Sequence, residues 1–236
     1  MSKTIAIVQS SYLPWKGYFD LIRSADVFVL YDDVQYTKRD WRSRNVIKTV
    51  QGPLWLTVPV RVKGRYHQLI KDVEIADRDW AERHWRSIEL AYRRAAGFAA
   101  HGAFIQSLLE KCAAMDALSA VNRFLIEQIA AALGISTPII DSSALGHVEG
   151  RSENLLHLCQ TLGGTTYLSG PAARSYLDET LFKQAGVGVR YMDYTGYPEY
   201  PQLHPPFEHH VSVVDLLLNV AQDVSRYLNR EFLLSI

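Results

Sequence analysis

The sequence predicts an α/β protein whose sheet has a parallel core, is flanked by helices, and is joined by extra helices in the C-terminal half. Ile5–Val8 and Val27–Tyr31 are short apolar runs rich in β-branched residues, which is typical of strands buried on both faces. The segment 15–25 between them has a helical pattern, so strand, helix and strand follow within about thirty residues. Strands and helices then alternate along the chain, which indicates a Rossmann-like sheet.

The other elements are inferred from apolar periodicity and from glycine and proline positions. Pro14 precedes the first helix, where proline is well tolerated. A polar loop is expected over 32–53. The further predicted strands are 54–60, 73–75, 138–140, 165–168 and 187–192. The further predicted helices are 78–94, 104–112, 117–133, 152–162 and 213–228, the last with Ser212 as its N-cap.

No stretch of linker composition divides the 236 residues, so we expect one domain over 1–236. Within it, residues 1–75 form a site-bearing βαβ part and residues 76–236 a helical and C-terminal α/β part. Hydrophobic residues make up 48% of the chain, enough for a sizeable core without disulfides or metal.

Charge and hydropathy narrow the class of protein. The 25 Lys and Arg residues balance the 25 Asp and Glu residues, which argues against a dedicated nucleic-acid binder. No segment approaches the about 20 apolar residues that a membrane span needs. The apolar run Ile5–Val8 is too short for a signal peptide. We therefore expect a cytoplasmic protein that does not associate with membranes.

The segment 9–18 leaves the carboxyl end of the first predicted strand and enters the first helix. Ligands bind at that edge of open α/β sheets, and a helix N-terminus favours anionic groups. A glycine in this segment would let the helix approach the sheet or a ligand closely. The alternative is a turn with core aromatic residues. The candidate binding residues here are Gln9, Tyr12, Trp15 and Gly17.

A basic and aromatic segment follows the second predicted strand. Between residues 36 and 48, five Lys or Arg side chains stand against one acid, Asp40. Basic residues interleaved with Trp and Tyr suit a phosphate beside a flat ring, as in a nucleotide or nucleotide sugar. The alternative is a solvated basic loop. The candidate substrate-binding residues here are Gln35, Tyr36, Lys38, Arg39, Trp41, Arg44 and Lys48.

Asp32 and Asp33 stand at the tip of the second strand and, with Tyr18, are the candidate catalytic residues. The two acids could coordinate Mg²⁺ beside a phosphate, or act as base or hydrogen-bond acceptor for an amine or hydroxyl. Alternatively, they cap the turn.

Motifs of several common site types are absent from the sequence. Neither G-x-G-x-x-G nor G-x-x-x-x-G-K-[ST] is present, and no serine stands in a G-x-S-x-G motif. His204, His209 and His210 are close in sequence, but H-E-x-x-H is absent and no carboxylate or cysteine stands at ligand spacing. The sequence therefore predicts no resident metal site.

The motifs of the two N-terminal segments resemble the WbqC-like family. They are Gln-x-x-Tyr-Leu-Pro-Trp-x-Gly-Tyr over 9–18, then Asp-Asp-Val-Gln-Tyr and Trp-Arg-x-Arg-Asn within 32–45. Similar segments recur to 212–217, so the resemblance spans essentially the whole chain. Departures are Ser43 in place of an expected asparagine, and Val220-Ala221 where a glycine is expected. The resembling segments add His84, Ser169 and Gln202 as candidate substrate-binding residues.

The N-terminal region is also similar to the start of pantothenate synthetase, of the nucleotidylyltransferase-like α/β class. The H-x-G-H of that enzyme falls on residues 15–18, so Trp15 and Tyr18 stand in place of both histidines. Its acid-binding glutamine falls on Gln35. This similarity implies a shared fold and a carboxylate substrate.

The WbqC-like resemblance implies a role in O-antigen or other surface-polysaccharide biosynthesis. We expect an enzyme that acylates or aminoacylates the amine of a nucleotide-linked amino sugar, with ATP and Mg²⁺ as candidate cofactors. The substrates would be a nucleotide sugar and an amino acid or hydroxy acid. In this scheme Lys38, Arg39 and Arg44 hold phosphates, while Asp33 orients the amine.

Two alternatives stay open. One is a transferase that uses a pre-activated donor, either an acyl-CoA or a charged tRNA, the latter being the one case in which a nucleic acid is a partner. The other is a non-catalytic protein that binds sugar nucleotides. The sequence predicts no particular oligomeric state.

Overall fold

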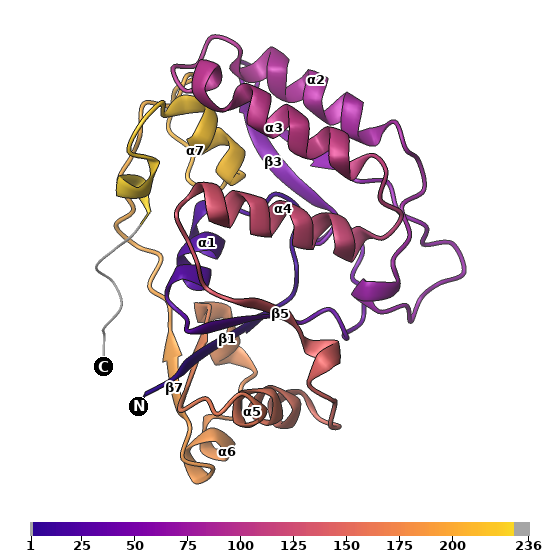
Figure 1. The fold of residues 1–236 in the computed structure, drawn as a ribbon, viewed down its shortest axis with the longest axis vertical. Helices are drawn as coiled ribbons and strands as arrows, with labels where there is room; N and C mark the ends of the chain where they lie inside the picture. The colour runs from indigo at the N-terminus through magenta and orange to yellow at the C-terminus, as the bar shows by residue number, and fades with distance from the viewer. Residues whose placement is uncertain (1, 229–236) are drawn as a thin grey trace.

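A five-stranded parallel sheet lies in the lower half of the molecule in a computed structural model that describes residues 2–228 (Figure 1). Its strand order is β5-β2-β1-β6-β7, and every pairing is parallel. The strands are β1 (Thr4–Val8), β2 (Val27–Leu30), β5 (Ile139–Asp141), β6 (Thr166–Ser169) and β7 (Gly188–Tyr191). The expected Rossmann-like α/β fold with a parallel-cored sheet is confirmed.

Helices cover both faces of this sheet. Along β1, Ile5 and Ile7 pack in a core with Leu155 and Leu158 of α5, whereas Ala6 belongs to the core on the other face. This alternation follows from the two-residue period of a strand. Figure 1 shows α5 and α6 on one side of the sheet and α1 and α4 on the other. The helices are α1 (Lys16–Arg23), α2 (Trp80–Tyr92), α3 (Phe98–Cys112), α4 (Leu118–Ala132), α5 (Arg151–Thr161), α6 (Glu179–Gln184) and α7 (Val213–Asn219).

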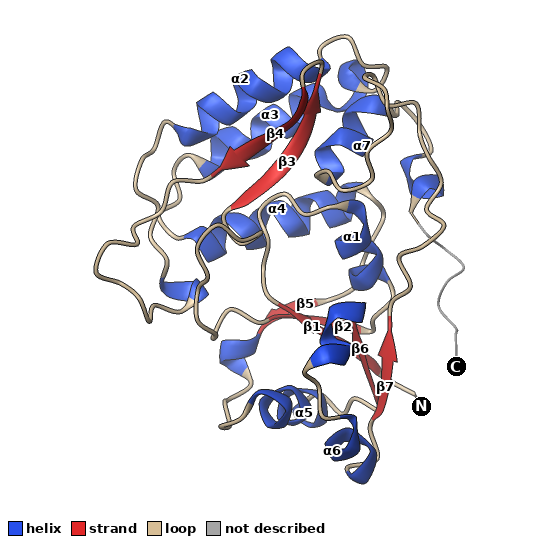
Figure 2. Cartoon of the chain, turned by 180° about the vertical axis from the view of Figure 1, so that it is seen from behind, coloured by secondary structure: helices blue, strands red, loops and turns tan. Residues whose placement is uncertain are grey.

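A second layer lies beyond α4. It consists of the antiparallel hairpin β3 (Arg44–Thr49) and β4 (Gly52–Thr57), together with α2, α3 and α7 (Figure 2). Gly52 has a φ of 103°, in the left-handed region, so a glycine suits the hairpin turn. The prediction of a polar loop over 32–53 is wrong for its C-terminal part, where β3 forms. Its sequence, Arg-Asn-Val-Ile-Lys-Thr, does not alternate regularly between polar and apolar residues, so the strand signal is weak.

Most other element assignments agree with the structure, but four differ. The third helix begins at Phe98, six residues before the predicted start, because small residues there weaken the apolar pattern. The C-terminal helix ends at Asn219 and not near Leu228, since Val220 is extended. Residues 74 and 75 form only isolated bridges in place of the strand expected over 73–75. The short helix α6 was not expected.

The strand order creates a switch point beside β1. From β1 the chain proceeds to β2 on one side, whereas β6 lies on the other side and is reached much later. Ligands of open α/β sheets bind beyond the carboxyl ends of strands at such a point.

None of the helices in the described part of the chain is both long enough and apolar enough to span a bilayer.

Candidate functional site

A cavity of about 800 Å³ opens at the carboxyl ends of β1, β2 and β6. We call it the sheet-edge cavity. Gln9 follows β1 and Gln35 lies beyond β2, and both line this cavity. The structure therefore brings the two N-terminal segments to one edge of the sheet. The other lining residues are Ile7, Val8, Tyr31, Val34, Arg42, His147, Gly150, Arg151, Leu155, Tyr167, Ser169, Gly170, Ala172, Ala173 and Tyr176.

The lining of the sheet-edge cavity is basic and aromatic. Arg42 and Arg151 contribute guanidinium groups, and none of the described lining residues is an acid. The Arg151 guanidinium lies 3.2 Å from the centre of the Tyr176 ring. Arg151 is also the first residue of α5, so the positive end of this helix reaches the cavity. This combination suits an anionic ligand that carries a ring.

Side-chain hydrogen bonds hold the loop before α5 against β2. Asn154 accepts from the backbone N–H of Val148 at 3.0 Å and donates to the Tyr31 hydroxyl at 2.7 Å. Gly150 has a φ of 92°, and a Cβ there would lie 2.1 Å from a carboxylate oxygen of Glu153. A glycine is therefore required where the loop turns into α5.

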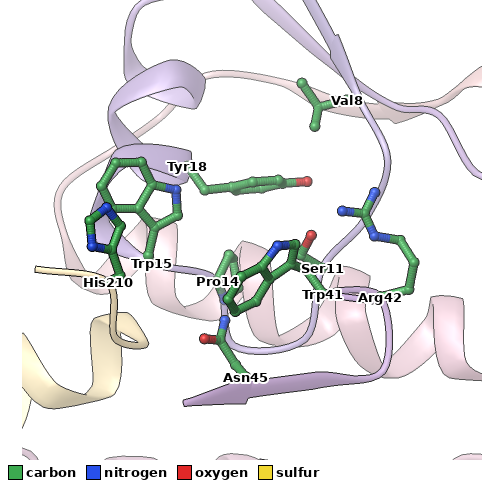
Figure 3. Close-up of a pocket in the computed structure, with 9 residues that line it drawn as sticks. All are labelled: Val8, Ser11, Pro14, Trp15, Tyr18, Trp41, Arg42, Asn45 and His210. Atoms are coloured by element: carbon green, nitrogen blue, oxygen red, sulfur yellow. The ribbon is translucent and has the colours of Figure 1, made fainter. Parts of the chain in front are cut away.

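A second cavity, of about 300 Å³, adjoins the first. We call it the aromatic cavity, because its walls include the rings of Trp15, Tyr18 and Trp41 (Figure 3). The Trp15 and His210 rings are stacked, with their centres 6.2 Å apart. The remaining lining residues are Val8, Ser11, Pro14, Arg42 and Asn45.

Arg42 lines both cavities. Its side chain donates to Oε1 of Gln9. The residue is only 9% exposed, and its buried Nε has no hydrogen-bond partner among the described residues. No carboxylate within 2–228 forms an ion pair with it. Arg42 is thus a buried cation at the junction of two cavities.

At Gly17 the structure shows a close contact with the side chain of Trp15. A Cβ at this position would lie 2.3 Å from the Trp15 ring. The absence of a side chain therefore lets the Trp15 indole fold back onto α1.

The two acids at the tip of β2 do not line the sheet-edge or aromatic cavity. They line a separate cavity of about 270 Å³ with Lys71 and Ser142. Asp32 accepts from the backbone N–H of Ser10 at 2.9 Å, and burial raises the pKa of its carboxyl group. Asp33 pairs with Lys71 at 2.8 Å and accepts from the Ser142 hydroxyl at 2.7 Å. Asp33 therefore lines a different cavity from Gln9 and Gln35.

Tyr12 and His84 contact each other inside the core. The Tyr12 hydroxyl lies 2.8 Å from Nδ1 of His84, and Nε2 lies 3.2 Å from the carbonyl oxygen of Thr57. Burial lowers the pKa of His84 to about 4, so the ring is neutral at pH 7. A neutral ring donates from Nε2 to Thr57 and accepts from Tyr12 at Nδ1.

Lys48 and Gln202 belong to another buried network. The ammonium group of Lys48 donates to Gln202 at 2.7 Å, and Gln202 donates to the carboxylate of Asp215 at 2.7 Å. The same carboxylate accepts from Tyr92 and Tyr200 at 2.6 Å each. These contacts hold β3 and α7 together.

Four other predicted binding residues lie outside both cavities. Tyr36 exchanges a 2.8 Å hydrogen bond with Ser43. The Lys38 ammonium lies 5.0 Å from the Tyr66 ring centre, and Arg39 is exposed. The Arg44 guanidinium lies 4.1 Å from the Trp55 ring centre. The first three of these residues lie in the loop before β3, and Arg44 is the first residue of that strand.

The structure adds cavity residues that sequence reasoning did not select. Arg42 stood in the basic segment, but its burial could not be read from the sequence. Tyr31 ends the second predicted strand. The region that contains His147, Arg151 and Tyr176 has no recognised ligand motif. The one local feature that could have pointed to it is the glycine before Arg151, at the start of a helix.

The WbqC-like protein family model matches residues 9–227 of the chain. The uncharacterized protein Rv1507c of Mycobacterium tuberculosis (strain ATCC 25618 / H37Rv) is 49% identical over 227 residues, which is 96% of this chain and 97% of the relative. No solved structure matches the chain significantly. The chain therefore belongs to the WbqC-like protein family.

Proposed function

We propose that this protein is an enzyme of surface-polysaccharide biosynthesis that acylates or aminoacylates the amine of a nucleotide-linked amino sugar. Membership of the WbqC-like family supports a role related to polysaccharide biosynthesis. The observation that carries the proposal is the sheet-edge cavity, which has guanidinium groups and tyrosine rings but no acid among its described lining residues. It lies at the switch point of the sheet, where α/β proteins bind nucleotides.

The geometry supports a nucleotide in three respects. Arg151 and the N-terminal end of α5 offer positive charge to phosphates. The Tyr31 and Tyr176 rings offer flat surfaces to a base or a sugar. The volume of about 800 Å³ falls in the range typical of small-molecule sites.

The reaction joins an amine to an activated carboxyl group. The amine nitrogen attacks the carboxyl carbon, the new C–N bond forms, and the bond to the leaving group breaks as the nitrogen loses a proton. If ATP activates the acid, a carboxylate oxygen first attacks the α-phosphorus and releases pyrophosphate, and AMP then leaves in the second step. His147 lines the cavity and is the candidate base.

Two other donors are compatible with the same cavity. A coenzyme A thioester or a charged tRNA would bring an already activated acyl group. Pyrophosphate release that depends on both ATP and an acid separates activation by this enzyme from these donors. Binding of a sugar nucleotide without turnover with any donor would indicate a non-catalytic binding protein.

The test is calorimetric titration of the protein with a panel of UDP-, dTDP-, GDP- and CDP-linked amino sugars. The wild type should bind a member of the panel, and Arg151→Ala should weaken that binding about ten- to hundredfold, because a charge-assisted hydrogen bond is lost. Arg86→Ala is the matched control, since Arg86 is exposed on α2 and pairs with Glu82 away from the cavity. Equal affinities of Arg151→Ala and wild type would contradict the site, as would no binding of the whole panel.

A further inference from the structure

The aromatic cavity has a single fixed positive charge. Among its described lining residues Arg42 is the one Lys or Arg, and none is an acid. Figure 3 shows the Arg42 guanidinium on one side of the space, with the Ser11 and Tyr18 hydroxyls facing the same region and the Trp15 and Trp41 rings forming other walls.

Asp32 and Asp40 are the two acids whose charges interact with Arg42, and both accept hydrogen bonds from other groups. Asp32 accepts from the backbone of Ser10, and Asp40 accepts from the Thr37 hydroxyl at 2.6 Å and the Trp41 backbone at 2.7 Å. Arg42 forms an ion pair with neither carboxylate: burial raises the pKa of Asp32, and the hydrogen bond from Thr37, aided by the Arg42 charge, lowers the pKa of Asp40. A buried charge without a counter-charge is unfavourable, so Arg42 is arranged for an anion that arrives from outside the chain.

We propose that the aromatic cavity binds a small carboxylic acid, whose carboxylate lies on Arg42 and whose body packs against Trp15, Tyr18 and Trp41. This inference rests on the proposed function, in which the acid is the group transferred to the sugar amine. A planar guanidinium matches a carboxylate with two parallel hydrogen bonds. One guanidinium balances the single charge of a carboxylate, whereas a phosphate monoester carries up to two.

The walls of the cavity indicate the body of the acid. Indole, phenol and proline rings line most of it, and the amide of Asn45 is already bonded to the backbone of Tyr12 and Leu13. A volume of about 300 Å³ lies at the small end of ligand sites. A compact aliphatic or aromatic acid therefore fits, and the Ser11 and Tyr18 hydroxyls could meet at most a small polar substituent such as a hydroxyl group.

The position of Arg42 would bring the two substrates together. Arg42 and Val8 line both cavities, so a carboxylate on this guanidinium lies at their junction. The carboxyl carbon would then face the sheet-edge cavity, where the sugar amine is proposed to lie. Holding the reacting groups side by side is a main source of rate enhancement in bond-forming reactions.

The test compares acids with their neutral amides in calorimetric titrations of the wild type without nucleotide. The panel is benzoate, 3-methylbutanoate and 3-hydroxybutyrate, each beside its amide, with phenyl phosphate as a second anion. At least one acid should bind about tenfold or more tightly than its amide. Because this comparison uses the wild type, it does not depend on the folding of a variant.

Two variants locate the binding site. Arg42→Gln should weaken acid binding about tenfold or more and leave amide binding unchanged. Trp41→Ala should weaken both, because Trp41 is a wall of the cavity. Tyr66→Ala is the control, since Tyr66 is 70% exposed and does not line the cavity.

Three results would overturn the inference: no binding of any acid at millimolar concentration, equal affinity for acid and amide, or tighter binding of phenyl phosphate than of benzoate. The inference and the proposed function can be contradicted independently of each other. If sugar nucleotides bind in a way that depends on Arg151 but no acid binds, the inference is wrong. The proposed function then stands with a pre-activated donor in place of the free acid. Acid binding without sugar-nucleotide binding would leave the aromatic cavity as an acid site and remove the proposed function.

Discussion

Arg42 and Arg44 are two positions apart in the same basic segment, yet their guanidinium groups have different surroundings. Arg42 is 9% exposed at the junction of two cavities, whereas Arg44 stacks on Trp55 at the start of β3. Both side chains end in the same guanidinium group, so they offer a ligand the same hydrogen-bond donors. The local path of the chain decides which one can meet a ligand.

His84 illustrates how burial determines the chemistry of a side chain. It is 7% exposed, beside the Trp80 ring and between the Tyr12 hydroxyl and the Thr57 carbonyl. Desolvation lowers its pKa from the usual 6.5 to about 4, and the nearby Arg83 charge acts in the same direction. A neutral histidine that fills both of its hydrogen-bonding positions stabilises the core.

This pKa shift predicts a pH dependence of stability. Because the folded-state pKa is the lower one, the unfolded chain takes up the proton first as the pH falls. The stabilisation is complete above about pH 6.5 and is lost as the pH falls towards 4. Between pH 7 and pH 5 the free energy of unfolding should fall by about 2 kcal/mol more in wild type than in His84→Gln.

Urea denaturation of both proteins at the two pH values measures that difference. His67→Gln removes an exposed histidine and should keep the wild-type pH dependence. If His84→Gln also keeps it, His84 is not the group that titrates.

Among the elements, α3 and α7 come into close contact at a glycine. The backbone N–H of Gly97, which precedes α3, donates to the carbonyl oxygen of Leu218 in α7 at 2.9 Å. A Cβ at Gly97 would lie 2.4 Å from the carbonyl oxygen of Leu217. Backbone atoms of α7 cannot move aside as a flexible side chain can, so this contact requires glycine.

We therefore expect Gly97→Ala to lower the free energy of unfolding by about 1–3 kcal/mol, the usual effect of overpacking. Gly102→Ala in the same helix is the matched control. Its added methyl would lie 3.2 Å from the Phe98 ring, which can shift, and alanine favours a helix by about 1 kcal/mol over glycine. Chemical denaturation should show a loss only at position 97, and equal effects at both positions would contradict the close contact with α7.

At the scale of the whole molecule, one core joins the sheet to the second layer. The same buried cluster contains residues of both layers: Ala6 of β1, Ile47 of β3, Ile88 of α2 and Leu217 of α7. The cluster on the other face of the sheet contains Ile5, so strand β1 contributes side chains to both clusters. Cores that share strands should unfold together.

The prediction of one domain over 1–236 can be tested by scanning calorimetry. We expect a single transition whose calorimetric and van't Hoff enthalpies agree, with a ratio of about 1. Two resolved transitions, or a ratio well above about 1, would instead show that the sheet and the second layer unfold as separate units.

Local patterns in the sequence predicted those elements that depend on near neighbours. The continuous apolar runs of β1 and β2 were recognisable because a strand buried on both faces has no polar side. The Ser212 cap was recognisable because its hydroxyl accepts from Val214, two residues along the chain. The two N-terminal segments were expected at one edge because parallel strands end on the same side.

The composition of the candidate site was decided by the tertiary structure. The sheet-edge cavity brings together Val8, Arg42, Arg151 and Ser169, because β6 pairs with β1 and α5 precedes β6. No local pattern in the sequence specifies that pairing. The fold likewise placed Tyr12 against His84 in the core and Asp33 beside Lys71. The sequence by itself determined which chemical groups are present and which segments form strands and helices, because these properties depend on residue type and short-range periodicity. Only the tertiary structure decided which groups face a cavity, because burial and charge pairing depend on contacts between residues far apart in the chain.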